Sequence, residues 1–136
     1  QYLTGMGFSN CGLGIVHSMA HGLGALYDTP HGVANAIILP TVMEYNADSC
    51  PEKMVELARA IHLPVTGNVE EDKYLLSAEL LKLTKELGIK TLSQQGIEEK
   101  DLNMLADDVL KEPVLGFNPR QNVTKEDVLA ILRKAL

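Results

Sequence analysis

The chain has 136 residues, of which 46% are hydrophobic and 22% charged, a composition that fits one globular domain with its own core. Its formal net charge is −6 and its basic residues are not clustered, which argues against nucleic acid and anionic membranes as partners. Its apolar stretches fall short of the roughly 18 residues of a membrane span, and no secretory leader is recognisable. We therefore expect a cytoplasmic location.

The first two predicted helices are rich in small and apolar residues. Residues 10–27 and 30–46 contain few charges, so we expect both helices to be buried on several faces. Thr29 and Pro30 should begin the second helix as its N-cap and first-turn proline. Pro40 should kink or interrupt that helix, because proline cannot donate a backbone hydrogen bond.

From residue 51 onward the predicted helices are amphipathic. Residues 51–62 have apolar side chains at helical spacing, and His62 ends the segment where a helix dipole favours a cation. These apolar positions are Met54, Leu57, Ala58 and Ile61. A helix over 68–87 should begin at a capping box formed by Asn68 and Glu71 and should stop before a glycine.

Two more helices are expected, over 98–111 and over 124–136, the second capped by Thr124 together with Asp127. No alternating pattern typical of a strand is found. The sequence therefore predicts an all-α helical bundle over residues 1–136, with a buried N-terminal half and an amphipathic C-terminal half. Cys11 and Cys50 form no recognisable motif and are expected to be reduced thiols.

Three of the four histidines lie close together in the first two predicted helices. His17 and His21 are four residues apart and therefore share one helix face. His31 follows in the first turn of the next helix, so all three imidazoles can converge if the helices pack side by side. Spacing alone supports a metal site and a set of core histidines about equally. Ser18 stands where a zinc protease motif would have glutamate, which excludes that class.

The pattern His17-x-x-x-His21-x9-His31-Gly, continued by V-A-N-A-I-I-L-P, resembles the signature of the iron-containing (group III) alcohol dehydrogenases. It is most similar to their lactaldehyde reductase and 1,3-propanediol dehydrogenase branch. The resemblance extends over G-M-G-F-S-N-C-G-L-G at 5–14, Tyr45-Asn46, and Asn118-Pro119-Arg120. It implies that the chain is the C-terminal helical, metal-binding domain, itself incomplete, of a two-domain enzyme. The N-terminal α/β domain of such enzymes binds NAD(P) and matches no segment here.

The resemblance also implies roles for individual residues. The family's Fe²⁺ or Zn²⁺ is held by one aspartate and three histidines, and the last two histidines match His17 and His31. His21 matches a histidine that is not a ligand but faces the cleft, where it would contact substrate or cofactor or pass a proton. Phe8 would line the substrate cleft. The aspartate and first histidine ligands match no residue here, and Asp28 is expected to occupy the turn between helices.

The function implied by the resemblance is the interconversion of small alcohols or diols and aldehydes with NAD(P), in a homo-oligomeric intact enzyme. The 136-residue chain alone should be inactive. Two alternatives are a non-catalytic helical interaction module and a different metal chemistry such as hydrolysis or dehydration. The intact ligand histidines argue against the first alternative. The second would require a base near the metal, and no carboxylate is found on the ligand helix.

Overall fold

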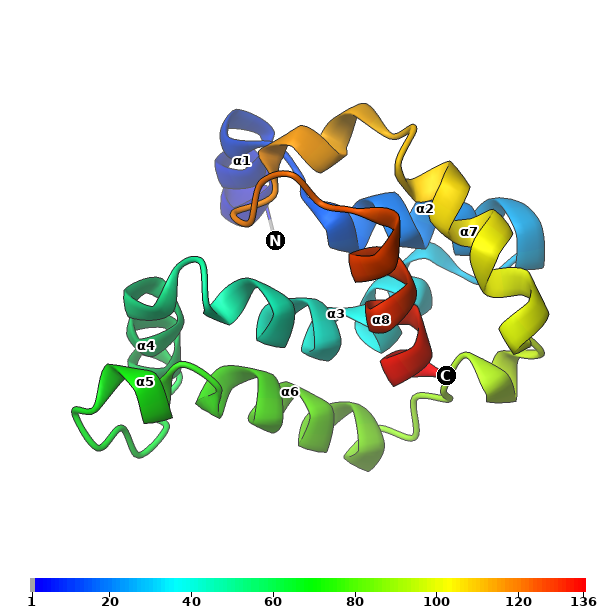
Figure 1. The fold of residues 1–136 in the computed structure, drawn as a ribbon. Coiled ribbons are helices and arrows are strands. Elements are labelled where there is room, and N and C mark those ends of the chain that lie inside the picture. The colour runs from blue at the N-terminus through cyan, green and yellow to red at the C-terminus, as the bar shows by residue number, and fades with distance from the viewer. Residues whose placement is uncertain (1) are drawn as a thin grey trace.

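Every regular element of the computed structural model, which describes residues 2–136, is a helix (Figure 1). The α-helices are α1 (Tyr2–Cys11), α2 (Ile15–Tyr27), α3 (His31–Ala47), α4 (Pro51–Ala60), α5 (Val69–Asp72), α6 (Leu75–Glu86), α7 (Leu102–Val109) and α8 (Lys125–Ala135). The 3-10 helices are η1 (Ser93–Gln95), η2 (Glu99–Asp101) and η3 (Pro113–Phe117). The all-α prediction is confirmed. No helix within residues 2–136 combines the length and apolar character that crossing a bilayer requires.

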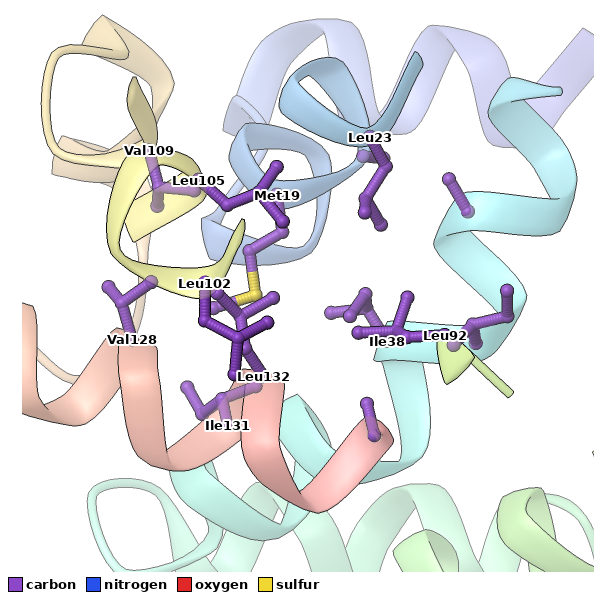
Figure 2. Close-up of a cluster of buried hydrophobic side chains, with 14 of the residues drawn as sticks. Met19, Leu23, Ile38, Leu92, Leu102, Leu105, Val109, Val128, Ile131 and Leu132 are labelled. Atoms are coloured by element: carbon purple, nitrogen blue, oxygen red, sulfur yellow. The ribbon is translucent and has the colours of Figure 1, made fainter. Parts of the chain in front are cut away.

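The centre of the fold is α3, which packs against α2, α6 and α8, while α7 packs across α2 and α8 (Figure 1). Figure 2 shows the main core, in which Met19 and Leu23 of α2 meet Ile38 of α3 and side chains from α7 and α8. A smaller cluster joins Ala47, Met54 and Leu76 near the far end of α3. The predicted division into two halves is therefore wrong, because the main core combines the first helices with the last.

The helix predicted over 10–27 is in fact two helices separated at residues 12–14. Gly12 adopts a φ of 79°, a backbone conformation that favours glycine. A Cβ atom at Gly12 would also lie 2.5 Å from Cγ of Phe117, so the aromatic ring packs directly on the glycine backbone. Gly14 follows in an extended conformation and precedes α2. The break therefore depends on a contact with η3, which local sequence patterns do not encode.

α3 departs from the predictions at its start and at its proline. Pro30 occupies the N-cap position without a side-chain cap, and the buried Thr29 precedes it, so the predicted threonine cap is wrong. The helix continues through Pro40, so the interruption did not occur, and the alternative of a kink stays a prediction. Proline removes one donor from the ladder. Because Pro40 is buried within a helix packed on three sides, tertiary contacts offset that loss.

The helix predicted over 68–87 is divided into α5 and α6. The Asp72 carboxylate accepts hydrogen bonds from the backbone N–H groups of Thr66 and Gly67, at 2.9 and 2.8 Å. These bonds hold α5 to the preceding loop instead of letting it continue. The Asn68 side chain accepts from the N–H of Glu70 at 3.2 Å, so the capping box expected with Glu71 is wrong.

The remaining helices follow their predictions more closely. The capping box of Thr124 and Asp127 is confirmed at the start of α8. The segment predicted over 98–111 divides into η2 and α7. α4 buries Met54, Val55 and Ala58, whereas Leu57 and Ile61 of the predicted stripe are exposed. His62 has a φ of 62° just beyond α4, in the left-handed conformation that often ends a helix.

Candidate metal-binding site

The three histidines converge where α2 packs along α3. The ring centroids of His17 and His31 are 5.3 Å apart with planes inclined by 51°, and those of His21 and His31 are 5.6 Å apart with planes inclined by 24°. Asp28 makes this possible as the left-handed C-cap of α2, with a φ of 53° that reverses the chain. The predicted convergence of the imidazoles and the turn position of Asp28 are both confirmed.

The separation of His17 and His31 can be compared with that of two rings on one metal ion. An imidazole nitrogen binds zinc at about 2.0–2.1 Å, so two rings at a tetrahedral angle have centroids about 5.2 Å apart. The observed 5.3 Å is compatible with this arrangement, and so is the 5.6 Å between the rings of His21 and His31, so the separation alone does not select the pair. Within residues 2–136, however, no group of three or more His, Cys, Asp or Glu side chains is arranged to hold an ion. The described residues therefore do not form a complete metal site by themselves.

The electrostatic environment favours the neutral form of His17. Burial lowers the pKa of His17 below its ordinary value, and positive charge on His31 and His21 lowers it further. Neutral imidazole is the form that binds a metal ion. Burial, together with the two neighbouring rings, therefore favours the form of His17 that can act as a ligand.

A largely apolar cleft of about 870 Å³ lies beside His17. Its walls come from the 11–17 segment, α3, α4 and η3, and include Leu39, Met43, Met54 and Phe117. Phe8 is exposed on α1 and is absent from the residues that line this cleft, so its substrate role stays a prediction. Cys11 and Cys50 are free thiols on the cleft wall, and burial raises the pKa of Cys50.

A pair of buried asparagines joins the two histidine helices. Asn118 donates to Oδ1 of Asn46 at 2.8 Å, and Asn46 donates to Oδ1 of Asn118 at 3.2 Å. The same Asn118 oxygen accepts the backbone N–H of Ile15 at 3.4 Å, at the start of α2. Because the N-cap residue Gly14 has no side chain, Asn118 caps α2 from 103 residues away. This pair fixes α2 relative to α3.

Arg120 contacts α3 beside the asparagine pair. Its guanidinium carbon lies 4.3 Å from the ring centroid of Tyr45, and Nη1 donates to the Tyr45 carbonyl at 3.5 Å. The two short motifs Tyr45-Asn46 and Asn118-Pro119-Arg120 are therefore partners in space. Both motifs stand out in the sequence, but no local pattern links residues 45–46 to residues 118–120.

On its other side, His21 meets a carboxylate that sequence analysis missed. Nδ1 of His21 lies 3.3 Å from Oε2 of Glu112, which immediately precedes η3. Both residues line a small cleft of about 280 Å³, distinct from the large cleft beside His17. The sequence offered no carboxylate on the ligand helix itself, whereas Glu112 approaches His21 from a segment 91 residues away.

Residues 1–136 match the family model described as Fe-containing alcohol dehydrogenase family, C-terminal. Lactaldehyde reductase of Escherichia coli strain K12 is 45% identical over 137 residues, which cover 99% of this chain and 36% of that protein. The 1,3-propanediol dehydrogenase of Klebsiella pneumoniae is 40% identical over 135 residues, covering 98% of this chain and 35% of that protein. This chain thus spans about a third of the length of these relatives.

Solved structures agree with the sequence comparisons. An alcohol dehydrogenase from Oenococcus oeni superposes with a TM-score of 0.92 and 38% identity, covering 98% of this chain and 35% of that one. A crystal structure of 1,3-propanediol oxidoreductase superposes with a TM-score of 0.86 and 38% identity, covering 91% and 33%. The helical arrangement of this chain is therefore that of the corresponding third of these enzymes.

Proposed function

This chain belongs to the Fe-containing alcohol dehydrogenase family and corresponds to its C-terminal part, and on that premise we propose a metal-dependent oxidoreductase function for the intact protein. The reaction is the interconversion of small alcohols or diols and aldehydes with NAD(P). Relatives named lactaldehyde reductase and 1,3-propanediol dehydrogenase support this substrate class. The observation that carries the proposal is the convergence of three imidazoles between α2 and α3.

His17 and His31 are the proposed metal ligands of this chain, and the remaining ligands belong to the rest of the intact enzyme. When bound, Fe²⁺ or Zn²⁺ would supply Lewis-acid polarisation of the alcohol or aldehyde oxygen. The family match supports the pair as ligands, their 5.3 Å ring separation is compatible with one shared ion, and burial, which lowers the pKa of His17, favours its neutral form. His17 also borders the large apolar cleft, which would exclude water from a small organic substrate.

His21 has a different proposed role, because its Nδ1 is directed to Glu112. A ring held in this way can contact the cofactor or substrate, or transfer a proton, while the two ligand rings remain on the metal. NAD(P) would be bound mainly by the N-terminal domain of the intact enzyme, and Phe8 would meet the substrate from α1. Reduced Cys11 and Cys50 are consistent with a cytoplasmic enzyme. A homo-oligomeric state remains part of the proposal.

The proposal is tested by replacing each histidine in the full-length enzyme and measuring metal content by mass spectrometry beside steady-state kinetics. His17→Ala and His31→Ala should lose most of their metal and should not recover on addition of modest Fe²⁺ or Zn²⁺. His21→Ala should retain nearly stoichiometric metal. Its turnover should fall by about 10²–10⁴-fold if His21 relays a proton. A smaller loss, mainly in cofactor affinity, would indicate a positioning role.

His62 offers a matched control, because it is the fourth histidine, lies beyond the end of α4 and belongs to neither ring pair of the cluster. His62→Asn tolerates the same positive φ and should leave metal content and turnover unchanged. The assignment fails if His21→Ala loses its metal while His31→Ala keeps it. In that case the pair on one face of α2 would hold the ion.

A further inference from the structure

We propose that Glu112 is a positioning residue for His21, whose imidazole it holds in one orientation and one tautomer. The inference rests on the proposed function, since it assigns a support to the histidine that acts beside the metal. It depends on the contact between Nδ1 of His21 and Oε2 of Glu112, at 3.3 Å. Glu112 is not directed at either ligand histidine by any hydrogen bond or ion pair within residues 2–136.

Hydrogen bonds fix the backbone on both sides of Glu112. The N–H of Glu112 donates to the Val109 carbonyl at 3.2 Å, and the Glu112 carbonyl accepts from the N–H of Leu115 at 3.1 Å. These bonds tie Glu112 to the end of α7 and to η3, and both elements pack against α2. The backbone of Glu112 is therefore held in place beside α2, and this places its carboxylate next to His21.

The nearest lysine in the chain does not compete with His21 for the Glu112 carboxylate. Lys111 adjoins Glu112 in the chain but pairs with Asp108, at 2.8 Å, one turn earlier. Within the described residues 2–136, His21 is the single ion-pair partner of Glu112. Oε2 of Glu112 therefore contacts the His21 imidazole, and the carboxylate is otherwise partly exposed to solvent.

A carboxylate at Nδ1 decides which ring nitrogen carries the hydrogen of neutral histidine. Glu112 can only accept, so Nδ1 becomes the donor and Nε2 keeps its lone pair. In metal sites, a carboxylate that accepts from the ring nitrogen not bound to the metal orients the histidine in the same way. Both side chains of this pair are partly exposed, at 41% and 34%, so solvent screens the attraction and little folding stability results. Its consequence is the direction of Nε2.

A double-mutant cycle in the full-length enzyme tests this role. Glu112→Ala should lower kcat by about 10-fold or more without reducing metal content, because His17 and His31 are untouched. Glu112→Gln should recover much of kcat, since its amide oxygen still accepts from Nδ1. In the His21→Ala background, Glu112→Ala should have no further effect, because Glu112 acts only through that ring. Asp107→Ala removes an exposed carboxylate of α7 that pairs with Lys125 and does not release Lys111, so it should match the wild type.

A second measurement reads the tautomer directly and does not need activity. Nitrogen-15 NMR of histidine-labelled full-length protein should show His21 protonated at Nδ1, and Glu112→Ala should convert it to a mixture of tautomers. Three results would each overturn the inference: multiplicative effects of the two substitutions on kcat, a loss of kcat in Asp107→Ala as large as in Glu112→Ala, or an unchanged His21 tautomer in Glu112→Ala. A wild-type enzyme without alcohol dehydrogenase turnover would refute the proposed function alone, because the NMR comparison would still decide the role of Glu112.

Discussion

The side-chain amide of Asn118 holds together the elements that carry the histidines. Its oxygen caps the first turn of α2 at Ile15, and its nitrogen is bound to Asn46 on α3. Asn118 is only 1% exposed, so each of these groups would be buried without water if the amide were absent. The position of His17 relative to His31 thus depends on a residue more than 80 positions later in the chain.

Asn118→Ala should therefore destabilise the fold by about 2–3 kcal/mol, because buried polar groups on Asn46 and Ile15 lose their partner. Urea unfolding monitored by circular dichroism measures this change. Asn103→Ala is the matched control, since Asn103 is exposed on α7. The control should change the unfolding free energy by less than about 0.5 kcal/mol. Equal effects of the two substitutions would show that the amide pair does not stabilise the protein.

At this same scale, the sequence predicted the histidine cluster but not the residues that support it. His17 and His21 share a face through local helical periodicity, and the short turn at Asp28 brings His31 to them. Asn118 and Glu112 reach their partners only through tertiary packing, across 72 and 91 residues. Helical periodicity reports only on residues within one helix, so it could not predict contacts between such distant positions.

At the scale of elements, the sequence predicted that the segments are helical, but it predicted where the helices begin and end less well. The Thr124 capping box is a local pattern, and it begins α8 as expected. The breaks at Gly12 and Asp72 arise from competing interactions. Phe117 packs on Gly12 from η3, and Asp72 bonds to the backbone of the preceding loop. In both places, contacts specific to the folded chain outweigh helix propensity.

The Asp72 loop should make stability depend on pH in the acid range. The N–H of Thr66, then that of Gly67 and the Thr66 hydroxyl, hold the pKa of Asp72 below its ordinary value against the opposing effect of burial. A depressed folded-state pKa stabilises the protein fully above the unfolded carboxyl pKa of about 3.9, and this contribution is lost as pH falls through the folded value.

The comparison that checks this is urea unfolding of the wild type and Asp72→Asn from neutral pH to about pH 2. The wild type should lose more stability across the acid range than Asp72→Asn, which should already be weaker at neutral pH. Glu71→Gln removes an exposed carboxylate next in the chain and serves as the control. Parallel pH profiles for wild type and Asp72→Asn would contradict the assigned role of the loop.

At the scale of the whole molecule, the fold joins the histidine helices to the last helices in one core. α7 and α8 complete the packing around α2 and α3 (Figure 1). The helices that carry His17 and His31 are therefore supported by segments from both halves of the chain. The all-α class was predictable from periodicity, whereas this pairing of distant helices was not. Beside these helices lie the apolar cleft and the His17–His31 pair, and within residues 2–136 no group of three or more His, Cys, Asp or Glu side chains is arranged to hold an ion.

The 136-residue chain by itself should therefore show no alcohol dehydrogenase turnover with NAD or NADP. A catalytic zinc site commonly has three protein ligands and an open position, whereas this chain offers the His17 and His31 pair, 5.3 Å apart. The measurement is nicotinamide absorbance during incubation of the purified chain with 1,2-propanediol and Fe²⁺ or Zn²⁺, beside the full-length enzyme as positive control. NAD-dependent oxidation by the chain that disappears in His17→Ala would contradict the prediction and would mean that two imidazoles suffice to assemble the site.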